Sequence, residues 1–146
     1  MGATTSVREV SNPSPTPALL VVSRFRVTDQ ARAAFLAAAA AAVDVLAAQT
    51  GCRTAALGQS TDDADLLVIR SEWDGVGAYR RGMSSCDVKV SAVPLLSMAI
   101  DEPSAYELVR EQAGGVLTVS DSGLAADAGQ VGLGSAAGPD VPSVAS

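Results

Sequence analysis

The sequence contains no histidine, and this absence removes several kinds of active site at once. Its 146 residues also include only two Phe, one Trp and two Tyr. Without His there is no Ser-His-Asp triad and no Cys-His pair, and the commonest haem ligand and a usual zinc ligand are missing. Any chemistry at this protein has to use other groups.

Basic residues are scarce as well. The chain has 10 Lys and Arg against 16 Asp and Glu, which gives a net charge of −6 and an isoelectric point near 4.4. Binding to nucleic acids or to an anionic membrane surface needs clusters of positive charge. We therefore expect neither a nucleic acid nor a membrane as a partner.

Signals for a disulfide, a secretory leader or a membrane span are missing too. Cys52 and Cys86 stand alone, without C-x-x-C spacing, and lone thiols are more typical of buried small residues than of a disulfide. The apolar stretch 33–48 is mostly Ala and is interrupted by Asp44, so it is too short and too weakly apolar to cross a bilayer. We expect a cytoplasmic protein.

The composition predicts one folded domain between two disordered segments. Residues 1–17 are rich in Pro, and residues 112–146 are dominated by Gly, Ala, Ser and Val, with no aromatic residue. Such segments bury too little apolar surface to fold by themselves. The folded domain is expected over residues 18–111, and Val116–Val119 is the one stretch of the tail that could add a strand.

Hydrophobic periodicity predicts an α+β domain of the ferredoxin-like type. We expect strands over 18–27, 52–59, 66–73 and 104–110, a helix over 29–49 capped by Thr28 or Asp29, and further helices after Asp74 and over 85–99, split at Pro94. In the first strand, Val21, Ser23, Phe25 and Val27 share one face. The order β-α-β-β-α-β gives a four-stranded antiparallel sheet with helices on one face. A second copy would cover the other face, so we expect a homodimer.

Two of the five aromatic residues lie close together in the sequence. Trp73 ends the third predicted strand and Tyr79 lies on the helix that follows it, with Arg80 next to it. Two interpretations remain open: a binding site, or a corner of the core filled by large side chains.

Four short segments, taken with the β-α-β-β-α-β order, resemble the antibiotic biosynthesis monooxygenase family of dimeric α/β barrels. The resemblance covers roughly residues 19–110. The segments are Thr50-Gly51-Cys52-Arg53, Arg70-Ser71-Glu72-Trp73, Ala78-Tyr79-Arg80 and Ser104-Ala105-Tyr106-Glu107.

The resemblance implies an enzyme that oxidises a quinol or a phenolic, polyketide-type aromatic with O2, without metal, flavin or other cofactor. It also implies an apolar pocket between the sheet and the helices. Trp73 would form a wall and donate its indole N–H, Tyr79 would hydrogen-bond the phenolic oxygen, and Arg80 would favour the anion. We expect Phe25, Met83 and Leu96 to bind the substrate.

The sequence departs from the family pattern at two places. Family members that cleave haem use an Asn and a His together with the Trp, and here the first strand has no Asn and the chain has no His. Polyketide monooxygenases have an Asn shortly before the Trp, where Ile69 stands here. The alternative is a non-catalytic dimeric relative that binds a small ligand.

One acidic stretch, Asp62-Asp63-Ala64-Asp65, invites a calcium interpretation. It lacks the Gly and the downstream Glu of an EF-hand loop. We expect a polar turn there and no metal site.

Overall fold

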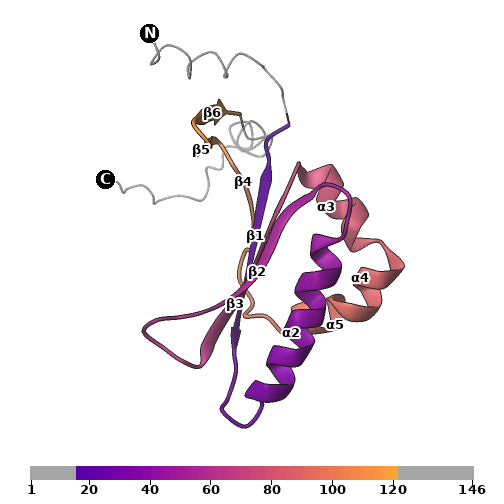
Figure 1. Cartoon of the computed structure of the whole chain (residues 1–146), viewed down its shortest axis with the longest axis vertical. Coiled ribbons are helices and arrows are strands. Elements are labelled where there is room, and N and C mark those ends of the chain that lie inside the picture. The colour runs from indigo at the N-terminus through magenta and orange to yellow at the C-terminus, as the bar shows by residue number, and fades with distance from the viewer. Residues whose placement is uncertain (1–15, 122–146) are drawn as a thin grey trace, which may run out of the picture. The chain divides into compact units, whose positions relative to one another are not determined.

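The computed structural model describes residues 16–121, and the chain divides into two compact units. The larger unit, Ala18–Glu107, holds eight elements (Figure 1). They are β1 (Leu19–Arg26), α2 (Arg32–Ala47), β2 (Cys52–Gln59), β3 (Leu66–Trp73), α3 (Val76–Met83), α4 (Cys86–Ser91), α5 (Val93–Leu96) and β4 (Ala105–Glu107).

The four strands of the larger unit form one antiparallel sheet in the order β2-β3-β1-β4. The central strands β1 and β3 pair along their whole length, from Leu19 opposite Trp73 to Arg26 opposite Leu66. All helices lie on one face of this sheet (Figure 1). The predicted α+β, ferredoxin-like architecture is therefore confirmed.

Alternation along the central strands decides which side chains meet the helices. Residues at every second position of β1 and β3 are buried, and the positions between them are half-buried or exposed. This is the two-residue period of a sheet with one covered face. Two polar residues, Ser23 and Ser71, lie on the covered face.

The Ala-rich helix α2 lies close to the sheet because its contact residues are small. Ala39 and Ala42 have no exposed surface, and the Phe35 ring packs against Phe25 with centroids 5.1 Å apart. The start of α2 differs from the prediction of Thr28 or Asp29 as the cap. The N-cap residue is Ala31, and no side chain makes a capping hydrogen bond there. Thr28 accepts a hydrogen bond from the Ala31 N–H at 3.3 Å, one turn earlier.

Gly51 makes the turn from α2 into β2. Its φ is +89°, and a Cβ atom there would lie 2.6 Å from the Cβ of Ala78 on α3. Only glycine meets both requirements without strain. Pro94 splits the last helical segment into α4 and α5, as predicted, and Ser85 caps α4 by accepting the Val88 N–H at 3.2 Å.

The end of the described chain differs from the prediction. The last strand of the sheet stops at Glu107 instead of Arg110, and β5 (Arg110–Ala113) and β6 (Val116–Val119) form a separate hairpin where disorder was expected from Gln112. The physical reason is the Gly114-Gly115 turn, whose φ angles of 60° and 82° suit a two-residue hairpin. The predicted disorder of residues 1–15 and 122–146 lies outside the described residues.

No helix among residues 16–121 is long and apolar enough to cross a membrane.

Candidate functional site

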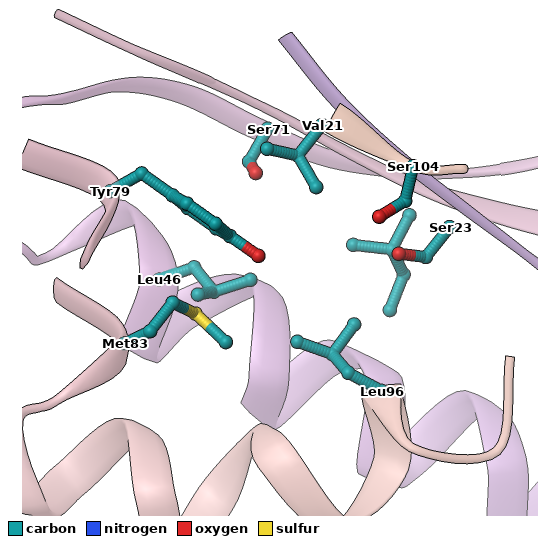
Figure 2. A pocket seen from close by; sticks show the side chains of 9 residues that line it. Val21, Ser23, Leu46, Ser71, Tyr79, Met83, Leu96 and Ser104 are labelled. Carbon is teal, nitrogen blue, oxygen red and sulfur yellow. The ribbon is translucent and has the colours of Figure 1, made fainter. Parts of the chain in front are cut away.

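A small cavity lies between the covered face of the sheet and the helices of the larger unit (Figure 2). Its volume is about 150 Å³. Strands β1 and β3 line it on the sheet side, and α2, α3 and α5 line it on the helix side. The apolar lining residues are Val21, Leu46, Ile69, Met83 and Leu96, and the polar ones are Ser23, Ser71, Tyr79 and Ser104.

The polar groups of the cavity come from opposite sides. Tyr79 enters from α3, whereas Ser23 and Ser104 enter from the far side, from β1 and from the residue just before β4. Figure 2 shows the hydroxyl oxygens of these three side chains directed toward the cavity. A ligand that fills the cavity would therefore have an apolar belt and polar groups at its two ends.

Trp73 lies behind the cavity and supports two of its polar groups. The indole is completely buried, and its N–H donates to the Ser71 hydroxyl oxygen at 2.9 Å. Its ring meets the Tyr79 ring edge-to-face, with centroids 5.5 Å apart and planes at 70°, a favoured aromatic geometry. Because Ser71 accepts from the indole, its own hydroxyl hydrogen remains available to donate to a ligand.

Gly82 allows Trp73 to occupy this place. A Cβ atom at Gly82 would lie 2.7 Å from the indole ring, which is closer than real Cβ contacts. The small residue on α3 lets the helix sit directly on the indole. Trp73 is therefore fixed from the sheet side by Ser71 and from the helix side by Gly82 and Tyr79.

The Tyr79 hydroxyl is the one titratable group that lines the cavity among the described residues. Burial raises the pKa of this phenol above its ordinary value, because an apolar environment disfavours the anion. Within residues 16–121 the hydroxyl has no hydrogen-bond partner in the protein. The protonated Tyr79 hydroxyl can therefore donate a hydrogen bond to a ligand in the cavity.

The structure brings together some of the predicted site residues and separates others. Tyr79, Met83 and Leu96 line the cavity, and Trp73 lies directly behind it. Arg80 is exposed, because one residue along a helix turns the side chain by about 100° from its neighbour. Its expected contact with a bound anion is therefore not supported by its position.

Phe25 is also outside the cavity. It shares the covered face of β1 with Ser23 but lies two residues farther along the strand, where its ring packs on Phe35 of α2. Consecutive positions on one face of a strand are about 7 Å apart. Phe25 is a core residue that does not line this cavity, and a role for it in binding substrate stays a prediction.

Three serines of the cavity, Ser23, Ser71 and Ser104, were not predicted as site residues. The signal was present for Ser23, which the alternation of β1 placed on the covered face among apolar residues. Ser71 carries the same signal on β3, where it lies between Ile69 and Trp73 on the buried positions. A serine on a buried strand face needs a hydrogen-bond partner or a ligand. Ser104 lies outside a regular element, so no periodicity could reveal it.

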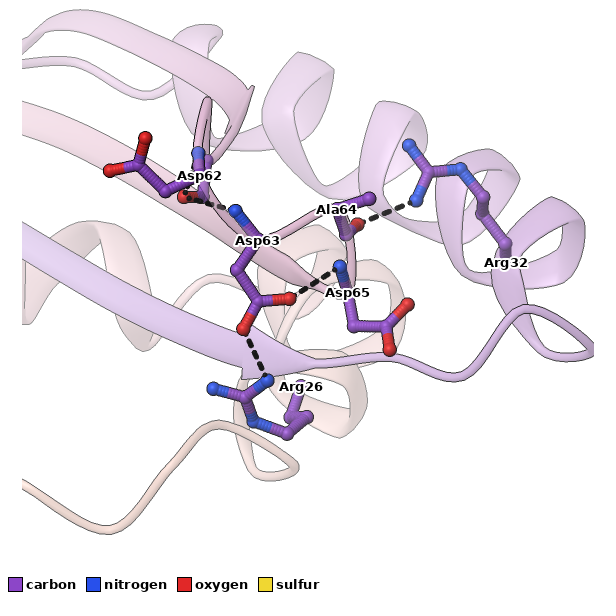
Figure 3. A network of polar contacts seen from close by, with 7 residues as sticks. Arg26, Arg32, Asp62, Asp63, Ala64 and Asp65 are labelled. Atoms are coloured by element: carbon purple, nitrogen blue, oxygen red, sulfur yellow. Dashed lines mark hydrogen bonds and ion pairs between the residues drawn. The ribbon is translucent and has the colours of Figure 1, made fainter.

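Hydrogen bonds within the acidic turn between β2 and β3, and from two arginines outside it, hold this turn in place (Figure 3). The Asp63 carboxylate accepts from Arg26 at 2.8 Å and from the Asp65 N–H at 3.0 Å, and the Arg26 guanidinium lowers the pKa of that carboxyl. Arg32 donates to the Ala64 carbonyl oxygen at 3.0 Å. The described residues hold no group of three or more His, Cys, Asp or Glu that could bind a metal ion. The stretch is a structural turn, as predicted.

Known structures share this fold. A structure of SnoaB, a cofactor-independent oxygenase from Streptomyces nogalater, is 23% identical, with a TM-score of 0.55, and the match covers 63% of this chain and 93% of that one. The structure of Rv0793 from Mycobacterium tuberculosis is 21% identical, with a TM-score of 0.53 and coverage of 66% and 98%. A conserved protein from Methanosarcina mazei Go1 is 21% identical, with a TM-score of 0.54 and coverage of 63% and 93%.

These likenesses establish the fold and leave the reaction open. No curated protein sequence matches the chain significantly. The family model described as antibiotic biosynthesis monooxygenase matches residues 18–89, which include β1 to α3, the first part of α4 and most residues of the cavity. Residues 18–89 are thus a domain of the antibiotic biosynthesis monooxygenase family.

Proposed function

We propose that the protein is a cofactor-independent monooxygenase that oxidises a quinol or phenolic aromatic with O2 in the cavity beneath β1 and β3. The observation that carries this proposal is the Tyr79 hydroxyl, a donor on a half-buried side chain that points into an otherwise mostly apolar cavity. The family membership and the fold shared with a cofactor-independent oxygenase support the reaction class.

The reaction balances with the substrate as its own reductant. For a hydroquinone, the bound phenolate transfers one electron to O2, and the aryloxyl radical and superoxide combine through a C–O bond on the ring. The peroxide takes up a proton, the O–O bond breaks, and the ring carbon loses its proton. One oxygen atom remains on the ring as a carbonyl and the other leaves as water, so hydroquinone and O2 give a hydroxyquinone and water.

The residues of the cavity would act by stabilising the phenolate. Tyr79 donates a hydrogen bond to the phenolate oxygen, and its raised pKa keeps it protonated while it does so. Ser71, oriented by the Trp73 indole, supplies a second donor. Apolar walls exclude water, which strengthens both hydrogen bonds.

A second candidate is a ligand-binding protein of the same fold without catalysis. The observation that favours it is the lack of a base: the described residues that line the cavity include no carboxylate, amine or thiol. A phenol would then have to arrive already ionised or lose its proton to water. A binding protein has no such requirement.

Oxygen uptake with a panel of hydroquinones, dihydroxynaphthalenes and anthrones separates the two candidates. The monooxygenase is expected to consume O2 faster than the autoxidation background and to place one atom of isotopically labelled O2 in the product, as seen by mass spectrometry. Saturable binding of the same compounds without uptake above background would favour the ligand-binding protein.

The missing base predicts a particular dependence on pH. The rate constant kcat/KM should rise by about tenfold per pH unit up to the pKa of the substrate phenol and then level off, because the reactive form is the phenolate. No decline is expected below about pH 10, since the pKa of Tyr79 is raised above the ordinary tyrosine value. Two phenols with different pKa values should shift the profile accordingly. An inflection that stays at one pH for both substrates would indicate a protein base instead.

The homodimer expected from the sequence remains part of the proposal. Leu20, Val22 and Tyr106 lie on the sheet face that the helices leave uncovered, in a groove of about 360 Å³, and Tyr106 is 50% exposed. Burying this face against a second copy would remove apolar surface from water. Light scattering at micromolar concentration should give twice the chain mass, and a monomer mass would contradict the dimer. The cytoplasmic location stays a prediction.

A further inference from the structure

The cavity under β1 and β3, named here the inner cavity, shares part of its lining with a second space. This outer groove has a volume of about 320 Å³ and is bounded by the segment 97–104. Ser23, Leu96 and Ser104 line both spaces. These three side chains therefore lie between the inner cavity and the outer groove, and we call them the neck.

The size of the inner cavity limits what can enter it. Its volume is about 150 Å³, similar to an engineered cavity of about that size in another protein, which binds benzene. One aromatic ring fills such a space. Two or three fused rings would have to displace the apolar walls, and inserting extra groups into a packed core carries a considerable cost in free energy.

The polar groups fix the direction of a ring in the inner cavity. Tyr79 donates from the α3 side, and the neck serines face it from the other side (Figure 2). A ring whose hydroxyl meets Tyr79 would point its opposite position toward Ser23 and Ser104. A substituent at that position would leave through the neck.

The wall of the outer groove is held in place by hydrogen bonds. The Ser104 carbonyl accepts the Val22 N–H at 2.7 Å, and the Arg24 carbonyl accepts the Ile100 N–H at 2.8 Å. Glu102 binds the Arg24 guanidinium through both carboxylate oxygens, each at 2.7 Å. The groove is lined by three serines among apolar side chains, and Asp101 adds negative charge to it, since the charge of Glu102 is paired with Arg24.

We propose that the substrate is a hydroxyarene with a single ring, which carries an uncharged polar substituent para to its hydroxyl. The ring occupies the inner cavity and the substituent passes the neck into the outer groove. This inference rests on the proposed function for the identity of the site. A carboxylate on the substituent would meet the Asp101 carboxylate, and this repulsion would weaken binding.

Calorimetric titration of the full chain under nitrogen tests the inference. The ligands are hydroquinone, 4-(2-hydroxyethyl)phenol, 4-hydroxyphenylacetate, 1,4-dihydroxynaphthalene and anthrone. We expect 4-(2-hydroxyethyl)phenol to bind about tenfold more tightly than hydroquinone and more tightly than the carboxylate and the larger ring systems. The Trp73 fluorescence should change on binding, because its ring contacts Tyr79.

The variant Leu96→Ala widens the neck and supplies a second measurement. Dihydroxynaphthalene should bind about tenfold more tightly to it than to the natural chain, while Val90→Ala, at a residue 72% exposed on α4, should leave binding unchanged. The titrations of the natural chain test the proposal even if Leu96→Ala does not fold.

The outcomes separate the inference from the proposed function. Equal or tighter binding of dihydroxynaphthalene or anthrone to the natural chain would overturn the inference about a single ring, and oxygen uptake on those compounds would leave the proposed function standing. Equal binding of hydroquinone and 4-(2-hydroxyethyl)phenol would overturn the role of the neck. Binding of none of the compounds would overturn both.

Discussion

The substitution Tyr79→Phe should lower kcat/KM for oxygen consumption by about 100-fold. The change removes one hydroxyl and keeps the ring that packs edge-to-face on Trp73. Removing a single donor from an oxyanion site in other enzymes costs about 100- to 1,000-fold, and Tyr79 is here the donor with no other partner among the described residues. The loss should appear in kcat/KM, because Tyr79 hydrogen-bonds the phenolate, which is the reactive form of the substrate.

Tyr106→Phe is the matched control for this measurement. Tyr106 lies on the uncovered face of the sheet, where its hydroxyl donates to the Pro103 carbonyl oxygen at 3.2 Å, and its loss should change kcat/KM by less than about twofold. Equal activity of Tyr79→Phe and the natural chain would show that the phenol takes no part in the reaction. Equal losses in both variants would point to a general effect on the fold.

The substitution Trp73→Ala should lower the free energy of unfolding by about 3–5 kcal/mol, the range for truncating a buried large aromatic residue. Trp73 is the largest of the fully buried side chains. Its removal also takes the donor from Ser71 and the ring contact from Tyr79. Urea unfolding followed by far-ultraviolet circular dichroism measures the change, since the variant has no indole fluorescence.

Trp73→Phe separates the packing role of this residue from its hydrogen bond. Phe fills much of the same volume but cannot donate to Ser71, so we expect a loss of about 1–2 kcal/mol, smaller than for Ala. Met98→Ala, at a residue 69% exposed, should leave the stability within about 0.5 kcal/mol of the natural chain. A loss below about 1 kcal/mol for Trp73→Ala would mean that the indole is not the centre of this core.

Alternation and Ala-rich helix propensity were sufficient to predict most of the fold. The bounds of β2 and β3 agree with the prediction, and Pro94 splits the last helical segment where expected. The hairpin over 110–119 was missed because its stability comes from backbone angles at Gly114 and Gly115. In a stretch rich in small residues, the same glycines are equally typical of a flexible segment.

The site was harder to predict because it depends on neighbours that are distant in the sequence. Tyr79 could be selected because large aromatic residues are scarce, and its position beside Trp73 could be expected. The Trp73 indole N–H could not be assigned a partner from the sequence. In the structure it donates to the Ser71 hydroxyl, two residues earlier on the same strand face, and not to a ligand. Ser104 reaches the cavity because β4 and the residue before it pair with β1, and no local sequence pattern encodes that pairing.

A crystal structure with 4-(2-hydroxyethyl)phenol, prepared under nitrogen, would show whether the cavity beneath β1 and β3 holds the substrate. We expect the ring between Met83, Leu46 and Ile69, with its phenolic oxygen within hydrogen-bond distance of the Tyr79 hydroxyl and its substituent passing Ser23 and Ser104. A ligand bound elsewhere on the domain, with this cavity empty and Tyr79 still without a partner, would contradict it.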